Sequence, residues 1–104
     1  MSQPRGRARR RHIRVTGFRL TERALDKMAV HGIYEEQLEQ ALSNPYRVIP
    51  NRRSQAAPYL FIGQDNGGAC IAAPIFPTES PTTWVPVTAW RCKPSEWARL
   101  PPLD

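Results

Sequence analysis

The stretch from Thr83 to Leu100 constrains the fold of this 104-residue chain more than any other. Its first eight residues alternate in a two-residue period, which is typical of a half-buried strand. In that alternation one face carries Val85, Val87 and Ala89, and the other carries Trp84, Thr88 and Trp90. Arg91 and Lys93 continue the first face. Pro94 favours a helix start, since its missing N–H would be unpaired in a first turn. The stretch therefore predicts a strand that holds two cations on rigid scaffold before a helix over 94–100.

Upstream, two short amphipathic helices precede a run of strands. Thr21 is the expected N-cap of the first helix and Gly32 its C′ residue. The second helix is predicted over 34–43 and ends at Asn44-Pro45. The expected strands cover 15–20, 47–49 (ending at Pro50), 59–63, 69–76 and 83–90, with a hairpin turn at 65–68. This order predicts an α+β domain in which helices cover one face of a three- or four-stranded antiparallel sheet.

The net charge of +6 is confined to the N-terminus. Residues 1–14 contain six arginines and no acid, while residues 15–104 contain nine basic and nine acidic side chains. We therefore expect a disordered tail over 1–14 and one folded domain over 15–104. The tail either contacts nucleic acid through phosphates, or is a solvated arm, or results from an upstream start codon. Its arginines are Arg5, Arg7, Arg9, Arg10, Arg11 and Arg14.

Other features exclude several classes of protein. No apolar run is long enough to span a bilayer, and the basic N-terminus has no apolar segment behind it as a secretory signal would. Cys70 and Cys92 form neither a disulfide framework nor a zinc site, so we expect buried free thiols and a cytoplasmic protein. No glycine-rich phosphate loop or metal-ligand cluster is present, so no cofactor or metal is expected.

The region from Leu20 to Arg53 resembles the helical hairpin of the BrnT-type toxins and of a related small uncharacterised family. The shared pattern is a helix, a His-Gly or Arg-Gly break (here at His31), an acidic second helix, and Asn/Asp-Pro before a strand. Residues 59–63 are similar to the family's strand ending in Ile-Gly. Residues 88–96 are similar to its last strand, in which Ala-x-Arg leads into a helix. The resemblance covers residues 18–100.

This resemblance implies a RelE-like fold, with two N-terminal helices packed on three or four antiparallel strands and a short C-terminal helix. It also implies a bacterial ribonuclease toxin of a type II toxin–antitoxin system, an endoribonuclease of the mRNA interferase type that inhibits translation without a metal. The implied partners are RNA and a cognate antitoxin protein, in a homodimer or a toxin–antitoxin hetero-oligomer.

Metal-free RNA cleavage needs cations near the developing phosphorane charge. Arginine suits this task because it stays ionised and can hold two phosphate oxygens. Arg91 and Lys93 are the first candidates, followed by Arg53 and the hydroxyl of Tyr59, while Arg52 in the same basic loop is a candidate for binding RNA. Arg91 could instead pair with a glutamate of the second helix.

His31 is the remaining catalytic candidate, because imidazole is suited to general acid–base catalysis. At a helix end it could equally interact with the last carbonyls. No obvious general base stands out. Two other functions therefore stay open, a non-catalytic RNA-binding module and a toxin-like fold kept for binding protein. An exposed ring of Trp84, Trp90 or Trp97 could stack on a base.

Overall fold

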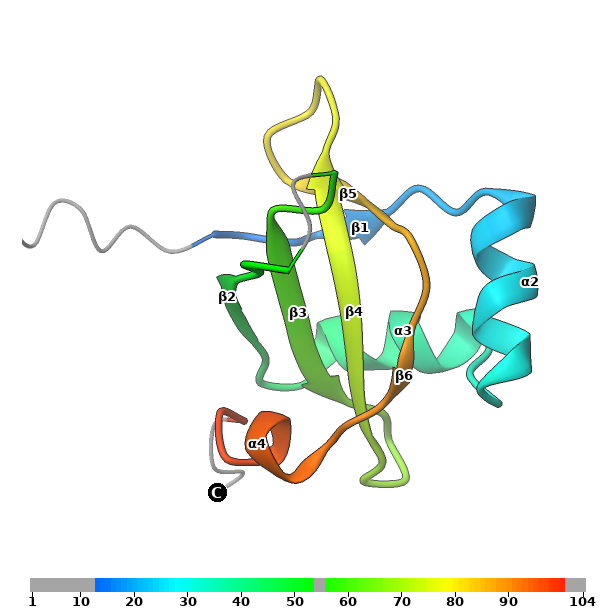
Figure 1. Ribbon diagram of the computed structural model, residues 1–104, viewed down its shortest axis with the longest axis vertical. Helices are drawn as coiled ribbons and strands as arrows, with labels where there is room; N and C mark the ends of the chain where they lie inside the picture. The colour runs from blue at the N-terminus through cyan, green and yellow to red at the C-terminus, as the bar shows by residue number, and fades with distance from the viewer. Residues whose placement is uncertain (1–12, 54–55, 101–104) are drawn as a thin grey trace, which may run out of the picture.

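The computed structural model describes residues 13–53 and 56–100, which form a sheet with helices on both faces (Figure 1). The helices are α2 (Glu22–Val30), α3 (Glu35–Ser43) and α4 (Pro94–Trp97). The strands are β1 (Gly17–Phe18), β2 (Arg47–Pro50), β3 (Tyr59–Gln64), β4 (Cys70–Pro77), β5 (Thr83–Pro86) and β6 (Trp90–Arg91). The expected α+β class is confirmed, and each predicted element has a counterpart in the structure.

The sheet is larger than expected and is mixed. Its six strands run in the order β1-β5-β4-β3-β2, with β6 also paired to β4. All pairings are antiparallel except that of β1 with β5, which is parallel. The prediction of a three- or four-stranded antiparallel sheet in a RelE-like layout is therefore wrong. Two short segments account for the difference, because β1 adds an edge strand and the strand expected over 83–90 is divided in two.

A bulge separates β5 from β6. Ile75 lies opposite Pro86 and Ala72 lies opposite Trp90, so three steps along β4 correspond to four on the facing chain. The extra residue reverses the alternation of side chains. Trp84 and Ala89, which the sequence placed on opposite faces, both belong to the hydrophobic core. Trp90 therefore lies on the other face of the sheet.

Pro74 gives a physical reason for this bulge. The carbonyl of Pro74 accepts a hydrogen bond from the Val87 amide at 2.9 Å. In a strand the N–H and C=O of one residue point to the same side, so the missing N–H of Pro74 also faces Val87. Regular pairing cannot continue there. The bulge also leaves the Thr88 hydroxyl as a buried side-chain atom without a hydrogen-bond partner in the described part of the chain.

We call the side of the sheet covered by α2 and α3 the core face. Here Phe61 contacts the rings of Phe18 and Tyr46, with centroid distances of 5.2 and 5.1 Å. α3 approaches β3 closely, because a Cβ on Gly63 would lie 3.1 Å from that of Ala41. Apolar side chains on this face are fully buried and form the main core of the domain. They include Met28, Ile33, Leu38, Phe61, Ile71 and Ile75.

The predicted ends of the first two helices are confirmed. The Thr21 side chain caps α2 by accepting a hydrogen bond from the Ala24 amide at 3.0 Å. α2 ends at Val30 with His31 as its C-cap, and Gly32 follows with a φ of 74°, a conformation that side chains with a Cβ rarely adopt. Gln37 accepts from the Tyr34 amide at the start of α3.

The opposite side, which we call the cleft face, carries Leu60, Ile62, Ala72 and Pro74, as their alternation with the core residues requires. Residues of α4 and Leu60 line one cleft on this side, so the expectation that helices cover one face only is wrong. α4 is also shorter than the predicted helix over 94–100. Within residues 13–53 and 56–100, no helix has the length and apolar character needed to cross a membrane.

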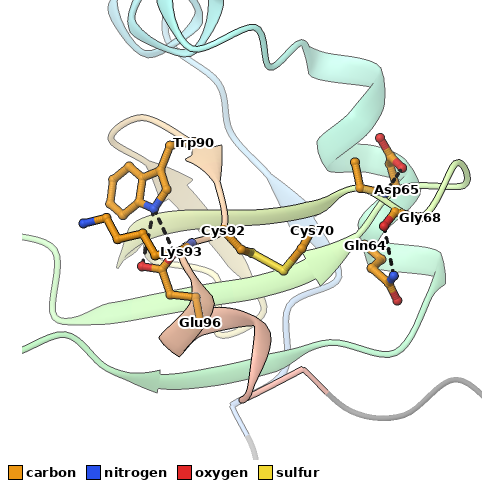
Figure 2. The surroundings of a disulfide bond; sticks show 9 residues. Gln64, Asp65, Gly68, Cys70, Trp90, Cys92, Lys93 and Glu96 are labelled. Atoms are coloured by element: carbon orange, nitrogen blue, oxygen red, sulfur yellow. Dashed lines mark hydrogen bonds between the residues drawn. A yellow bond between two sulfur atoms is a disulfide. The ribbon is translucent and has the colours of Figure 1, made fainter.

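Cys70 and Cys92 form a disulfide, with Cα atoms 5.3 Å apart, so the prediction of free thiols is wrong (Figure 2). The sequence places the two residues in separate apolar segments, and only the pairing of β6 with β4 brings them together. The bond closes a loop with a sequence separation of 22. By restricting the unfolded chain, such a loop contributes about 3 kcal/mol to the free energy of unfolding.

Candidate functional site: an arginine-lined cleft

A cleft of about 550 Å³ lies on the cleft face. The described residues of the loop after β2, 51–53 and 56–57, form one wall, α4 and the residues after it form the other, and the sheet forms the floor. The floor is apolar, with Ile49, Leu60, Pro74 and Val87, and the tryptophan of β6 adds an indole ring. The polar and charged residues of the walls are Asn51, Arg52, Arg53, Trp90, Ser95, Glu96 and Arg99.

Asn51 holds the wall after β2 in place. Its backbone amide donates to the Pro58 carbonyl at 2.8 Å, and its side-chain amide donates to the Ala57 carbonyl at 2.8 Å. Its side-chain oxygen accepts from the Arg53 amide at 3.3 Å. One asparagine thus braces both ends of the turn that presents Arg52 and Arg53, which reduces the ordering cost of binding an anion there.

Glu96 organises the opposite wall (Figure 2). Its carboxylate accepts from the Lys93 amide at 2.8 Å and from Trp90 Nε1 at 3.1 Å. Lys93 Nζ lies 5.7 Å from the centre of the Trp90 ring, within the range of a cation–π contact. These contacts join the end of β6 to the first turn of α4. They fix the orientation of the indole ring beside the cleft.

The walls carry an excess of positive charge. Arg52, Arg53 and Arg99 are exposed and line the cleft, together with the single carboxylate of Glu96. Within the described residues these arginines form no ion pair, and the salt bridge found there joins Arg19 to Glu79 at 2.7 Å. By contrast, three glutamates lie on α3, at Glu35, Glu36 and Glu39. A neutral domain therefore presents a basic surface on one side of its sheet and an acidic helix on the other.

The arrangement suits a nucleotide. A volume of 550 Å³ is within the usual range for small-ligand sites, and an apolar floor beside an indole offers contact to a base. Guanidinium groups at the rim can bind phosphate oxygens in pairs. A carboxylate among them can accept a hydrogen bond from a base edge or a ribose hydroxyl.

The structure does not gather the five predicted catalytic residues. Arg53 lines the cleft, as does Arg52 from the predicted binding set. Lys93 lies next to the cleft over Trp90. Tyr59 points to the core face, where its ring meets that of Trp84 edge-on at 5.6 Å. His31 is exposed at the end of α2, in the position that the helix-end interpretation assigned to it.

Arg91 lies near Asp65 rather than in the cleft. Burial raises the pKa of Asp65, but this is outweighed by hydrogen bonds from Gln37 and from the amides of Ala69 and Gly67. The positive charge of Arg91 adds to these effects, so the pKa of Asp65 lies below its ordinary value. Within the described residues Arg91 forms no ion pair with a glutamate of α3, and its charge acts instead on this turn aspartate.

Of the predicted tail arginines, only Arg14 is described. It is exposed, and its carbonyl accepts a hydrogen bond from Trp84 Nε1 at 3.0 Å, which anchors the start of the domain. Arg5, Arg7, Arg9, Arg10 and Arg11 lie outside the described residues.

Sequence reasoning missed Arg99 and Glu96 as site residues. Glu96 and Arg99 are three residues apart and follow Pro94, so the sequence alone indicates that they lie on one side of a helical turn. What it could not show is that this turn lies beside the loop after β2. In the described ranges, no three His, Cys, Asp or Glu side chains gather as a metal site would require.

Comparison with known proteins gives no further assignment. The sequence matches no protein-family model, and no curated protein is significantly similar to it.

Proposed function

We propose that the protein binds single-stranded RNA, with one nucleotide held in the arginine-lined cleft. The observation that carries this proposal is the presence of Arg52, Arg53 and Arg99 around an apolar floor that lies beside an indole ring. Phosphates bind at the rim, and the base lies against Trp90 and the floor. A single strand fits better than a duplex, since only an unpaired base can enter a cleft of this size.

The arginine-rich N-terminus adds affinity that does not depend on sequence. In this proposal the tail raises the rate and strength of association, and the cleft determines which strand is held and in what register. Removing residues 1–12 then weakens binding and reduces its salt dependence without abolishing the contribution of the cleft.

A binding experiment tests the cleft directly. Fluorescence anisotropy with a short fluorescein-labelled RNA compares the intact chain with the double variant Arg53→Ala/Arg99→Ala. We expect a loss of at least about ten-fold in affinity, because each arginine gives up a charge-assisted contact with phosphate.

The matched control is Arg19→Ala/Arg23→Ala, which removes the same charge from exposed residues outside the cleft. It should change the affinity by less than about three-fold at physiological salt, since screened charges at a distance contribute little. Equal losses in the two double variants would show that binding depends on net charge alone and would refute the cleft.

A second candidate function is RNA cleavage, as in the toxin family that the sequence resembles. It is favoured by Glu96, which brings a carboxylate to the same cleft as three arginines. The carboxylate would take the proton of a ribose 2′-OH, which then attacks the adjacent phosphorus while the arginines stabilise the phosphorane. The 5′-oxygen leaves and is protonated, giving a 2′,3′-cyclic phosphate and a 5′-OH end.

Induced expression in a bacterial host, with mapping of new RNA 5′-OH ends, tests this second function. Glu96→Gln should abolish the new ends if the cleft is the active site, whereas Arg91→Ala should abolish them if the site predicted from the sequence is correct. If the unmodified protein binds RNA but produces no new ends, RNA binding without catalysis is the function that remains.

An antitoxin partner and a cytoplasmic location belong to this second proposal. The expectation of free thiols no longer supports the cytoplasm, since Cys70 and Cys92 form a disulfide and stable disulfides are typical of oxidising compartments. A disulfide in a cytoplasmic protein is more often a redox-responsive one.

A further inference from the structure

The disulfide lies at the joint between the sheet and the wall of the cleft. Cys92 follows β6 directly and precedes Lys93, the N-cap of α4 (Figure 2). Cys70 is the first residue of β4 and is 3% exposed. The bond therefore ties the segment that carries Glu96 and Arg99 to a central strand.

Within the described chain, α4 is also linked to the sheet through β6, because Glu96 accepts a hydrogen bond from Trp90 Nε1. α4 has four residues, and none of them is buried. Its capping contacts, from Glu96 to Lys93 and Trp90, are all made within residues 90–96. A helix this short is not stable alone in water. After Arg91, the backbone attachment to β4 is the hydrogen bond from the Cys92 amide to the Cys70 carbonyl at 3.0 Å.

We propose that the Cys70–Cys92 disulfide is a redox latch that controls RNA binding in the cleft, an inference that rests on the proposed function. In the oxidised protein the latch holds α4 and Arg99 in place as the cleft wall opposite the loop after β2. In the reduced protein residues 92–100 leave this position, and the cleft loses one wall with its arginine and its carboxylate.

The geometry also defines the chemistry of opening. Cys92 is partly exposed, whereas Cys70 is buried, so a thiolate of an external dithiol attacks the sulfur of Cys92. The Cys70–Cys92 bond breaks, Cys70 leaves as a thiolate and takes up a proton, and Cys92 forms a mixed disulfide with the reductant. The second thiol of the reductant then attacks the reductant sulfur that is bonded to Cys92. This closes the disulfide of the reductant and releases Cys92, which takes up a proton. Two electrons pass to the protein, and the dithiol becomes a disulfide.

The affinity for RNA therefore depends on the redox state of the surroundings. In a reducing environment the cleft lacks the α4 wall and the affinity for RNA is low. In an oxidising environment the wall is in place and the affinity is high. The chain has only these two cysteines, so a dithiol acts at this bond alone.

The experiment compares the intact chain before and after reduction with dithiothreitol. Affinity for the fluorescein-labelled single-stranded RNA should fall by about ten-fold on reduction and recover on reoxidation, as expected for loss of a charge-assisted phosphate contact. In parallel, amide hydrogen exchange at residues 96–100, whose N–H groups donate to backbone carbonyls in the oxidised protein, should become faster.

The variant Cys70→Ala/Cys92→Ala provides the control. It should bind RNA as the reduced protein does and should not respond to dithiothreitol, while circular dichroism shows that it remains folded at the assay temperature. If the variant does not fold, the reversible change in the unmodified protein still decides the question.

The outcomes separate the two proposals. Equal RNA affinity in both redox states refutes the latch and leaves the proposed function intact. No RNA binding in either state refutes the proposed function, and with it control of RNA binding, while the exchange rates at 96–100 still show whether the disulfide holds α4. Unchanged exchange after reduction refutes the latch whatever the affinity.

Discussion

Both faces of the sheet carry apolar side chains, and Ile62 and Ala72 on the cleft face are fully buried too, but the part of that face beneath the cleft is less completely covered. On the core face, α2 and α3 bury Met28, Leu38 and Phe61 fully, and aromatic rings meet at about 5 Å. On the cleft face, a four-residue helix with no buried residue covers only part of the sheet. Leu60 on that face stays partly exposed beneath the cleft.

This difference indicates a division of roles. A tightly packed face supplies stability, because buried apolar area is the main favourable contribution to folding. A face that leaves apolar residues open to solvent at the bottom of a basic cleft gives up some of that stability and retains a surface for a ligand. This division of roles can be tested by changing equivalent side chains on the two faces.

The largest effect should come from truncating the same residue type on each face. Leu38→Ala on the core face should lower the free energy of unfolding by about 3 kcal/mol, since it leaves a cavity among fully buried side chains. Leu60→Ala on the cleft face should cost only about 1 kcal/mol, because the side chain is partly solvated. Urea denaturation of the two variants measures both values.

The affinity for RNA should change in the opposite order, with the larger loss in the cleft-face variant. The folded fraction of Leu38→Ala should retain its affinity for single-stranded RNA, whereas Leu60→Ala should weaken it by removing part of the cleft floor. Equal stability losses, or a loss of affinity in Leu38→Ala alone, would contradict the division of roles between the faces.

A smaller effect is expected at the bulge between β5 and β6. Thr88→Val replaces a buried hydroxyl that has no partner with a methyl group of similar size, and should stabilise the protein by about 1 kcal/mol. The contrasting variant is Thr78→Val, whose hydroxyl donates to the Thr83 carbonyl at 2.7 Å and accepts from the Ser80 amide. It should destabilise the protein by a similar amount, and thermal unfolding would show shifts of opposite sign.

The smallest effect concerns pH. Because the folded-state pKa of Asp65 lies below its ordinary value of 3.8, the ionised carboxylate favours the folded state. This contribution is complete above the unfolded-state pKa and is lost as the pH falls through the folded-state pKa. Asp65→Asn should therefore reduce the acid sensitivity of the urea midpoint below about pH 4. The same pH dependence in both proteins would exclude Asp65 as a source of acid sensitivity.

Local signals predicted the elements of this fold well. Thr21, Gly32 and Pro45 mark helix ends through caps and backbone restrictions that act within a few residues. The turn at 65–68 follows from the same local chemistry, and its Gly68 has a φ of 89°. These features need no knowledge of the tertiary structure, so the sequence is enough to find them.

The errors arose where distant segments meet. A two-residue alternation cannot reveal that Pro74, on another strand, interrupts the pairing of residues 83–90, so Trp90 was assigned to the same face as Trp84. The disulfide was missed for the same reason, since the pairing of Cys70 with Cys92 depends on the register of β6. The cleft also combines a loop and a helix that are far apart in sequence, which is why Arg52 and Arg53 were found and Arg99 was not.

The edge strands β1, β2 and β6 also affect how copies of the chain can meet. An edge strand with free N–H and C=O groups can pair with the same edge of another molecule and start aggregation. Here β1 and β6 have only two residues each, and β2 has four, beginning with a charged Arg47 and ending with Pro50, which has no N–H to donate. Both ends of the sheet are therefore poor templates for adding a strand. The described edges therefore disfavour self-association through a continuous intermolecular sheet.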